Sequence, residues 1–391
     1  MVQVEVTASG MAAGGDALAR EESGRVVFVS GALPGERVLV DLTEQRKDFA
    51  RGHVVQVLDP SADRVAPPCP HVARGCGGCQ WQHAGLAAQA RYKADVVADA
   101  LRRIAHRPDP PIAPDVVRLP DTATRTTVRF RVVDGRPAFH RRQATDLVSV
   151  NSCLVAHPLV EEVLRDGRFD GAEEVAVRVG AGTGERLVVA HPNGRGVIAP
   201  PDVRVVGTRS KAWYHEEVAD RRWRVSALSF FQSGREAAQA LVDAVRGAAG
   251  PRPRRVLDAY AGVGVLGGAL EPERLEAIES TPSAAADARS NLADLGADVF
   301  EQEVATWVAD RPGSFDVVVA DPARPGLGKS AAAALAAAQA PRLVLVSCDP
   351  ASLARDTNLL DDLGYDLASV QVLDLFPHTF HVEAVSRFEL R

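Results

Sequence analysis

Five cysteines supply the first chemically reactive groups, and they fall into two sets. Cys69, Cys76 and Cys79 lie within eleven residues, with glycines between them, and Cys153 follows far downstream. Thiols at this spacing in a reducing compartment are typical of a metal site rather than of disulfides. Three clustered thiols and one remote thiol suit the four-thiolate ligand set of a [4Fe–4S] cluster. A zinc site, which usually uses two paired cysteine motifs, and unliganded core cysteines are the alternatives.

The fifth cysteine, Cys348, follows the apolar run 343–346 and comes directly before a predicted helix. A helix N-terminus favours a thiolate, so we expect the pKa of Cys348 to be lowered. A structural cysteine is the alternative interpretation. Asp321 ends a neighbouring predicted strand, and Glu383 lies near the end of the sequence, on a strand that could pass the same pocket. A thiolate and a carboxylate together predict covalent catalysis with a general base.

A glycine-rich loop, Gly262-x-Gly264-x-x-Gly267, follows a predicted strand and begins a helix, as nucleotide-binding loops do. Asp258 closes that strand, and Glu279 closes the next one, where a carboxylate accepts hydrogen bonds from ribose hydroxyls. S-adenosylmethionine is favoured over a dinucleotide, because it has no pyrophosphate for Asp258 to repel and carries an ammonium group. In the alternative interpretation, Asp258 only caps the helix.

These groups together predict methylation of a pyrimidine at C5. Addition of a thiolate to C6 of uracil creates an enolate, whose C5 atom can take a methyl group from a sulfonium donor. A base must then remove the C5 proton before the thiolate can leave. Cys348 and Glu383 fit these two roles, and Asp321 is expected to hydrogen-bond the pyrimidine edge or to orient the donor.

The elements that position these groups divide the chain into three parts. Short strands separated by Gly/Pro turns predict a small β-barrel over residues 1–60, and residues 61–225 are β-rich around one long helix. Residues 226–391 alternate strands and helices, which predicts an α/β fold with a doubly wound, mostly parallel sheet. The predicted strands are 24–29, 36–41, 52–58, 126–133, 173–179, 186–190, 202–206, 256–258, 315–320 and 343–346, and the predicted helices are 85–106, 283–295, 330–340 and 351–363.

Charge is distributed unevenly along the chain. The net charge is −6, yet residues 64–142 hold fourteen Lys and Arg against six Asp and Glu. Such a basic segment in an acidic chain indicates a phosphate-binding surface, with a solvated arginine-rich face as the alternative. No run approaches the roughly eighteen apolar residues of a membrane span, and the first residues do not resemble a signal peptide. We therefore expect a cytoplasmic protein with no membrane partner.

Five motifs occur in an order that resembles the RNA 5-methyluridine methyltransferases, in the branch with a TRAM barrel and a [4Fe–4S] cluster. They are Ser229-Phe230-Phe231-Gln232, the Asp258 loop, Asp321-Pro322-x-Arg324, Ser347-Cys348-x-Pro350 and Phe376-Pro377-His378-Thr379-x-His381-x-Glu383. The resemblance covers nearly the whole chain. It implies a Rossmann-like class I methyltransferase domain, a TRAM/OB-like barrel and a helix at about 82–106 that packs on the catalytic part.

The resemblance also implies roles for individual residues. Cys348 would be the nucleophile and Glu383 the base, and Cys69, Cys76, Cys79 and Cys153 would hold the cluster. The S-adenosylmethionine site would comprise Gln232, Asp258, Tyr260, Gly262, Gly264, Glu279 and Asp321. The substrate would be 23S rRNA or tRNA, bound by a monomer that extrudes the target base. Candidate phosphate contacts are Arg125, Arg129, Arg131, Arg141 and Arg142.

The chain departs from the pattern of this family without losing a group that makes or breaks bonds. The departures, which bear on cofactor affinity and on substrate identity, are Gly234, Ala261, Val265, Ala323 and Asp349. A cytosine-5 RNA methyltransferase is an alternative, but it would use two cysteines, whereas Cys348 is the only one after residue 153. An amino-group methyltransferase would need an aromatic residue at Arg324. A non-catalytic RNA-binding protein or chaperone would not need both Cys348 and Glu383.

Overall fold

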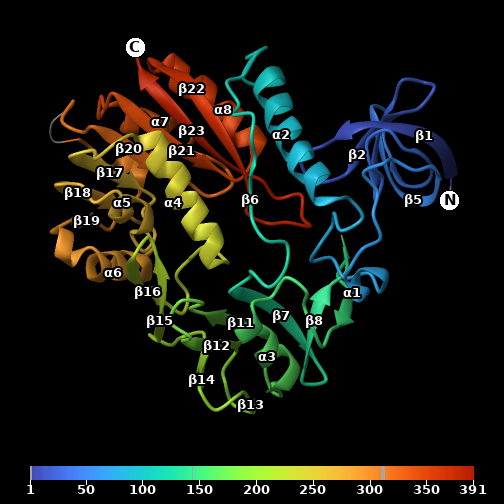
Figure 1. The fold of residues 1–391 in the computed structure, drawn as a ribbon, viewed down its shortest axis with the longest axis horizontal. Coiled ribbons are helices and arrows are strands. Elements are labelled where there is room, and N and C mark those ends of the chain that lie inside the picture. Colours follow the sequence, from blue (N-terminus) through green and yellow to red (C-terminus); the bar gives the residue numbers. More distant parts are fainter. Residues whose placement is uncertain (1, 143, 310–312) are drawn as a thin grey trace.

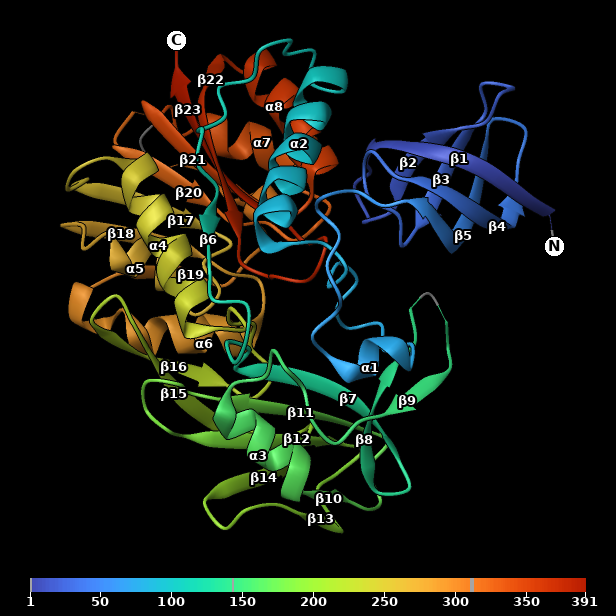
Figure 2. The ribbon, with the colours of Figure 1, turned by 45° about the vertical axis from the view of Figure 1, so that its right-hand side comes forward.

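In the computed structural model, which describes residues 2–142, 144–309 and 313–391, the chain forms three lobes (Figure 1). A β-barrel at the N-terminus and an α/β lobe at the C-terminus lie on either side of one long helix, α2. A central β-rich lobe completes the arrangement, and Figure 2 shows the barrel clearly separated from the β-strands of that lobe. None of the helices in the described part of the chain has both the length and the apolar character that a membrane crossing requires.

The first lobe is a closed barrel with strand order β1-β2-β3-β5-β4, which confirms the predicted barrel. Alternate residues of its strands point inward, so that Val27 and Val29, for example, are fully buried. β5 approaches β4 so closely at Gly52 that a Cβ there would lie 2.5 Å from the carbonyl oxygen of Asp41. The strands are β1 Val2–Met11, β2 Ala17–Arg20, β3 Val26–Ser30, β4 Arg37–Gln45 and β5 Phe49–Asp59.

Helix α2 (Leu86–Arg103) joins the barrel to the α/β lobe. A short helix, α1 (Pro70–Ala73), precedes it. Residues one turn apart on one face of α2, such as Tyr92 and Val96, pack into the barrel core. Val97 and Leu101, on an adjacent face, pack into the core of the α/β lobe. The helix therefore has two apolar faces, which explains why so little of its surface reaches solvent.

The central lobe is a six-stranded sheet of order β14-β12-β11-β7-β8-β9 covered by helix α3. Each of the four strands predicted between 126 and 206 is present within one residue of its predicted bounds. The elements are β7 Thr127–Val133, β8 Arg136–His140, β9 Leu147–Ser149, α3 Pro158–Asp166, β11 Glu174–Val179, β12 Arg186–His191 and β14 Val203–Gly207, with a separate pair, β10 Arg168–Phe169 and β13 Val197–Ile198.

The third lobe is an eight-stranded sheet of order β19-β18-β17-β20-β21-β23-β22-β6. β17 to β21 run parallel and only β23 is antiparallel to its neighbours, which confirms the predicted mostly parallel α/β fold. The strands are β6 Val117–Arg118, β17 Arg255–Ala259, β18 Arg274–Ile278, β19 Asp298–Phe300, β20 Val317–Ala320, β21 Arg342–Ser347, β22 Tyr365–Asp374 and β23 Glu383–Leu390. The helices are α4 Arg235–Ala249, α5 Val265–Ala269, α6 Pro282–Asn291, α7 Gly328–Ala336 and α8 Pro350–Asp362, with 3-10 turns at Ala293–Leu295 and Val304–Thr306.

Three predicted elements in this lobe differ from the structure by two residues or more. The helix predicted at 283–295 ends at Asn291 and is followed by a separate 3-10 turn at Ala293–Leu295, and the strand predicted at 315–320 begins at Val317. The helix predicted at 330–340 spans Gly328–Ala336. Beyond Ala336 the N–H groups of Ala338 and Gln339 bond to carbonyl groups three residues earlier, and Gln339 has a positive φ of 50°. The helix therefore does not continue to residue 340, where Pro341 also disfavours helical backbone. Alanine-rich composition extended the sequence-based prediction past this stop.

A hairpin that the sequence did not indicate, β15 (Trp213–Val218) and β16 (Arg221–Ser226), lies between the central sheet and the α/β lobe. Its turn residues, Ala219 and Asp220, both have positive φ, so the hairpin uses a turn that normally contains glycine. Tyr214 and Trp223 are buried in the core shared with α4 and α5. The packing of the α/β lobe therefore begins upstream of residue 226.

Candidate active site

The register of β21 and β23 brings Cys348 and Glu383 together. Ser347 pairs with Ala384, so the next position along each strand carries Cys348 and Glu383, respectively. Asp321 directly follows β20, the neighbour of β21 on its other side, and emerges at the same edge of the sheet. The three groups that the sequence singled out are therefore neighbours, and the charges of both carboxylates act on the thiol.

The pKa of Cys348 is raised to about 11, which shows that the predicted lowering by the helix N-terminus is wrong. Burial has the largest effect, and the negative charges of Glu383 and Asp321 add to it. The helix cannot compensate, because Asp349 is its N-cap and accepts a hydrogen bond from the Ser352 N–H at 2.7 Å. One of the free N–H groups of the first turn is thus already satisfied by a carboxylate.

The two carboxyl groups also favour their protonated forms. Glu383 is 4% exposed, and burial holds its pKa well above the ordinary value, with a further contribution from Asp321. Burial likewise raises the pKa of Asp321 to about 7. Arg324 is the positive charge that opposes these shifts at both Cys348 and Glu383. The sequence indicated Arg324 only as part of a motif, without a role.

Cys348 lines a cavity of about 60 Å³ where the barrel, α2 and the α/β lobe meet. Its walls come from the α/β lobe, from the barrel turn 12–14 and from α2. The side chains of Trp81, Lys93 and His381 lie on these walls, and none was predicted as a site residue. Lys93 was detectable in principle, because a lysine in the apolar stripe of a predicted helix is unusual.

Lys93 forms a buried ion pair with Asp374, at the end of β22. Its Nζ also donates to the carbonyl oxygen of Phe376 at 3.1 Å, and both charged side chains are at most 3% exposed. In addition, the backbone N–H of Trp81 donates to the carbonyl oxygen of His378 at 2.8 Å. The loop that leads to Glu383 is thus held by α2 and by the segment after Cys79.

We expect Lys93→Met to destabilise the protein by about 3–5 kcal/mol, because it leaves the Asp374 carboxylate buried and unpaired. The exposed pair of Arg103 and Asp99 on the same helix is the matched control, and Arg103→Gln should cost less than about 1 kcal/mol. Urea unfolding measures both changes. Adding Asp374→Leu to Lys93→Met should recover most of the lost stability. Equal stability of the Lys93→Met and Arg103→Gln variants would contradict the prediction.

The predicted cofactor loop lies at the carboxyl edge of the sheet, as expected. Gly264 is the N-cap of α5 with a φ of 95°, and a Cβ at Gly267 would lie 2.7 Å from the side chain of Asp258. Asp258 Oδ2 accepts a hydrogen bond from the Gly267 N–H at 2.8 Å, so the carboxylate does cap the helix. Its Oδ1 atom is buried without a partner among the described residues, and burial raises the pKa of Asp258 to about 7.

The second carboxylate of the loop, Glu279, accepts hydrogen bonds from the N–H groups of Gly262 at 2.9 Å and Thr281 at 2.6 Å. A Cβ added to Gly262 would meet no atom within 4 Å, so the space above the loop is open. Tyr260, between strand and loop, has a φ of 63°, which is strained for an aromatic residue and typical of functional sites. An orphaned carboxylate oxygen beside an open glycine loop fits a ligand with hydroxyl and ammonium groups.

Gln232 lies half-buried between β16 and α4, two residues after the exposed Phe230. The departure at Gly234 has a structural reason, because a Cβ there would lie 3.0 Å from the carbonyl oxygen of Thr124. An asparagine, which the resembled family usually has at this position, would have to displace the 124 backbone. The structure does not explain the departures at Ala261, Val265 and Ala323.

The four cysteines predicted to bind a metal belong to loops that contact one another. Cys76 forms an isolated β-bridge with Arg141, and His71 Nε2 lies 3.2 Å from the hydroxyl of Ser152, beside Cys153. Burial raises the pKa of Cys153 to about 11, and the charge of Cys79 contributes to the shift. Among the described residues, no three His, Cys, Asp or Glu side chains are arranged as a finished metal site. The donor set fits a thiolate-bound metal, and the cluster stays a prediction.

The five predicted RNA-contacting arginines have different surroundings. Arg142 forms an ion pair with Asp16 in the barrel at 2.9 Å, and Arg129 and Arg131 share Glu174. The guanidinium of Arg125 lies 5.5 Å from the ring centre of Phe376, and its charge also acts on Cys79. The side chain of Arg141 lies against Gly75 in the cysteine loop. All five arginines thus have contacts within the chain.

Comparisons with known proteins agree with this architecture. Residues 1–55 match the TRAM domain family. A Streptomyces coelicolor protein named "uncharacterized RNA methyltransferase" is 35% identical, over 99% of this chain and 93% of the relative. The 23S rRNA (uracil(1939)-C(5))-methyltransferase RlmD of Shewanella halifaxensis is 29% identical, over 94% and 92%.

The fold has a counterpart of nearly equal extent among solved structures. The crystal structure of Pyrococcus abyssi tRNA (uracil-54, C5)-methyltransferase in complex with S-adenosyl-L-homocysteine superposes with a TM-score of 0.72 at 21% identity, covering 98% of this chain and 99% of that one. The shared fold extends through all three lobes. With this architecture and with 35% identity to a named relative along the whole sequence, the chain belongs to the family of RNA methyltransferases that carry a TRAM domain.

Proposed function

We propose that the protein methylates C5 of a uridine in structured RNA, with S-adenosylmethionine as the methyl donor. The observation that carries this proposal is the position of Cys348 and Glu383, each one residue beyond the Ser347–Ala384 pair that ends the antiparallel β21–β23 ladder. An amino-group methyltransferase needs no thiol, whereas C5 methylation of uracil needs a nucleophile for C6 and a base for the C5 proton. Both are present beside the cofactor loop.

In the proposed reaction, the Cys348 thiolate bonds to C6 of the extruded uracil, and the C5–C6 double bond opens toward O4. C5 then forms a bond to the methyl carbon of the donor, whose sulfonium becomes a thioether. The Glu383 carboxylate takes the C5 proton, the double bond re-forms and the C6–S bond breaks, which returns the thiolate. Arg324 stabilises the negative charges of this sequence, since its charge opposes the raised pKa values of both groups.

S-adenosylmethionine, when bound, supplies an electrophilic methyl group on a positively charged sulfur. Glu279 and the unpartnered Oδ1 of Asp258 would hold its hydroxyl and ammonium groups, with Tyr260 and Gln232 on the flanks of the loop. Gly262 leaves room for the ligand to approach, whereas Gly264 lets the loop pack closely on Leu292, whose side chain would lie 2.8 Å from a Cβ at this position. Asp321, at the next strand end, would orient the reacting groups between the loop and Cys348.

The raised pKa values predict how the reaction depends on pH. The reactive forms of Cys348 and Glu383 are deprotonated, and a group with a raised pKa loses its proton only at higher pH. We therefore expect kcat/KM to rise continuously from about pH 6 to about pH 9. A rate constant that is flat over this interval would mean that the thiolate exists at neutral pH, contrary to the structure. Initial rates of methyl transfer in buffers of constant ionic strength provide the measurement.

The four cysteines outside the α/β lobe hold a [4Fe–4S] cluster in this proposal, and the cluster braces the fold. The donor set consists of the three thiols between residues 69 and 79 together with Cys153. The Cys153 N–H donates a hydrogen bond to the Glu161 carboxylate at 2.8 Å, which holds this residue in place. Iron and sulfide analysis of protein purified without oxygen should give about four of each per chain. Cys76→Ser should lower both contents and the thermal midpoint, whereas Cys348→Ala should change neither. Zinc without sulfide would refute the cluster.

The substrate in this proposal is 23S rRNA or tRNA, because the name of one relative includes 23S rRNA and the name of a protein with the same fold includes tRNA. Nucleoside mass spectrometry of both RNAs from cells lacking this chain tests the function. We expect one 5-methyluridine to disappear and to return when the purified enzyme is added. Loss of 5-methylcytidine instead would identify a cytosine-5 enzyme, and no change in either nucleoside would favour a binding-only protein.

A further inference from the structure

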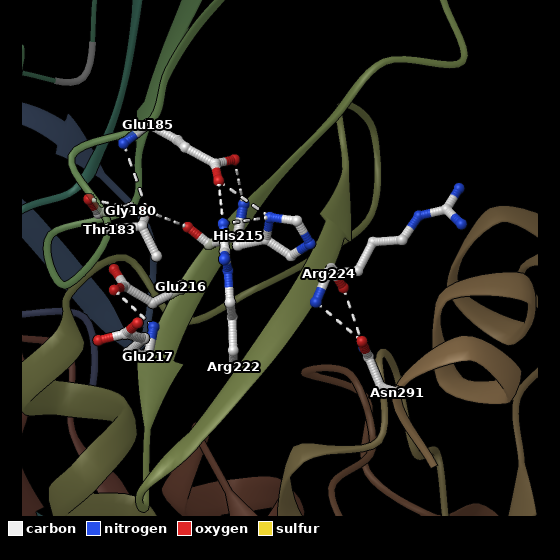
Figure 3. Close-up of polar contacts among 9 residues, drawn as sticks. All are labelled: Gly180, Thr183, Glu185, His215, Glu216, Glu217, Arg222, Arg224 and Asn291. Atoms are coloured by element: carbon white, nitrogen blue, oxygen red, sulfur yellow. Dashed lines mark hydrogen bonds and ion pairs between the residues drawn. The ribbon is translucent and has the colours of Figure 1, made fainter. Parts of the chain in front are cut away.

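Two polar side chains one turn apart on α6, Asp287 and Asn291, face the hairpin rather than solvent. Asp287 is fully buried. Asn291 ends the helix and reaches the backbone of β16 at Arg224, as Figure 3 shows. Neither residue was singled out in the sequence, and neither belongs to the reacting groups described above.

Asp287 holds the start of the segment that leads to Gln232. Its carboxylate accepts hydrogen bonds from the N–H of Ser226 at 2.7 Å and from the hydroxyls of Ser226 at 2.8 Å and Ser229 at 2.9 Å. Arg224 Nε lies 3.2 Å from the same group. A buried carboxylate with this many donors is fully compensated, so it fixes the path of residues 226–229.

Asn291 holds both the hairpin and the cofactor loop. Its Oδ1 accepts from the Arg224 N–H at 2.8 Å, and its Nδ2 donates to the Arg224 carbonyl oxygen at 2.9 Å, as a neighbouring strand would. The same Nδ2 donates to the carbonyl oxygen of Val263 at 2.9 Å. Val263 lies between Gly262 and Gly264, so this bond sets the position of the loop itself.

The other side of the hairpin is fixed to the central lobe. Glu216 accepts hydrogen bonds from the N–H groups of Ala181 and Gly182, both at 2.8 Å. Glu185 bonds the imidazole of His215 at 2.9 Å, as Figure 3 shows. The hairpin is therefore held between the β11–β12 turn and α6. Because the hairpin is bonded to the central lobe on one side, the polar face of α6 contacts a hairpin whose position is already fixed.

We propose that Asp287 and Asn291 are positioning residues for S-adenosylmethionine: one face of α6 sets the spacing between the Gln232 segment and the glycine loop. The inference rests on the proposed function, because it requires both segments to contact the cofactor. Neither side chain touches the donor. They act through the Ser226–Ser229 backbone and through the Val263 carbonyl group, so they control cofactor affinity and leave RNA affinity unchanged.

A matched control is available at the same junction. Asp294 forms an ion pair with Arg221 of the hairpin at 2.7 Å, but its side chain is 62% exposed and has no bond to the cofactor loop. Asp294→Asn thus removes the charge from a contact between the same two elements without touching Val263. Asn291→Asp keeps the acceptor for the Arg224 N–H and loses the donor for the carbonyl oxygens of both Arg224 and Val263, so it breaks the bond to the loop while one bond to the hairpin remains.

The test measures S-adenosylhomocysteine affinity by calorimetry, with KM and kcat for both substrates. We expect Asn291→Asp and Asp287→Asn to weaken S-adenosylhomocysteine binding by about tenfold and to raise KM for S-adenosylmethionine equally, with KM for RNA within about twofold of wild type. Asp294→Asn should match wild type. If the Asn291 and Asp287 variants bind like Asp294→Asn, the inference is overturned, whereas a wild-type protein that does not bind S-adenosylhomocysteine would overturn the proposed function. Circular dichroism and thermal melting identify a variant that does not fold, and in that case Asn291→Ser replaces it.

Discussion

Replacing Cys348 with alanine is expected to reduce methyl transfer by roughly 10⁴-fold or more, because C5 of uracil is not nucleophilic until C6 bears the thiolate. The side chain is half-buried at the edge of the sheet and has no hydrogen bond that the fold depends on. Thermal stability and S-adenosylhomocysteine affinity should therefore stay close to wild type. Transfer of radiolabelled methyl groups to RNA measures the loss.

Cys348→Ser is the sharper variant, because its hydroxyl keeps the shape of the site but ionises far less readily than a thiol. It should be as inactive as the alanine variant. Activity within about tenfold of wild type in either variant would contradict a covalent mechanism, since general acid–base catalysis alone would then account for most of the rate.

Replacing Glu383 with glutamine is expected to stop the reaction after methyl transfer. Without a base, the C5 proton stays and the thiolate cannot leave, so turnover should fall by about 10²–10⁴-fold. One S-adenosylhomocysteine should form per enzyme in a burst, and a covalent complex of enzyme and methylated RNA should accumulate. Rapid quench followed by denaturing electrophoresis detects both products.

Glu389 offers the control for this variant, because it lies on the same strand, is about half exposed and, among the residues that the structure describes, forms ion pairs with Arg342 and Arg387. Glu389→Gln should turn over normally and show no complex. If Glu383→Gln lost activity without a burst, Glu383 would act before methyl transfer, and its role as the base for C5 would be wrong.

The strand-end chemistry was predictable because the position of a residue in a parallel sheet follows from its sequence pattern. Asp321 and Cys348 each follow an apolar run, and runs of this kind form buried parallel strands whose ends share one edge. Glu383 was harder, since β23 is antiparallel and enters the sheet after β22. The sequence showed a carboxylate near the end of the chain, but only the register of β23 against β21 shows that it lies beside Cys348.

The ionisation of the site was not predictable from sequence. A cysteine before a helix suggested a lowered pKa, but the outcome depends on burial and on two carboxylates that arrive from other strands. The sign of such a shift is a difference between opposing effects, each set by three-dimensional neighbours. Asp349 was interpreted from the sequence as a departure from a family pattern, whereas the structure shows that its side chain is the N-cap of α8.

Contacts between lobes were also outside the reach of the sequence. Lys93 and Asp374 lie almost three hundred residues apart, and the Trp81 contact to His378 spans a similar distance. Periodicity indicated the helix around Lys93 but not which side each lobe would cover. The hairpin at 213–226 was missed because its alternating charged residues and glycine-free turn resemble a solvated loop.

Trapping with RNA that contains 5-fluorouridine tests the central claim most directly, because fluorine at C5 cannot be removed as a proton. In the presence of S-adenosylmethionine, the wild-type enzyme should form a stable covalent complex in which mass spectrometry maps the link to Cys348. Cys348→Ala should form none. A wild-type enzyme that methylates normal RNA but forms no adduct with the fluorinated RNA, or forms one through another residue, would contradict the account.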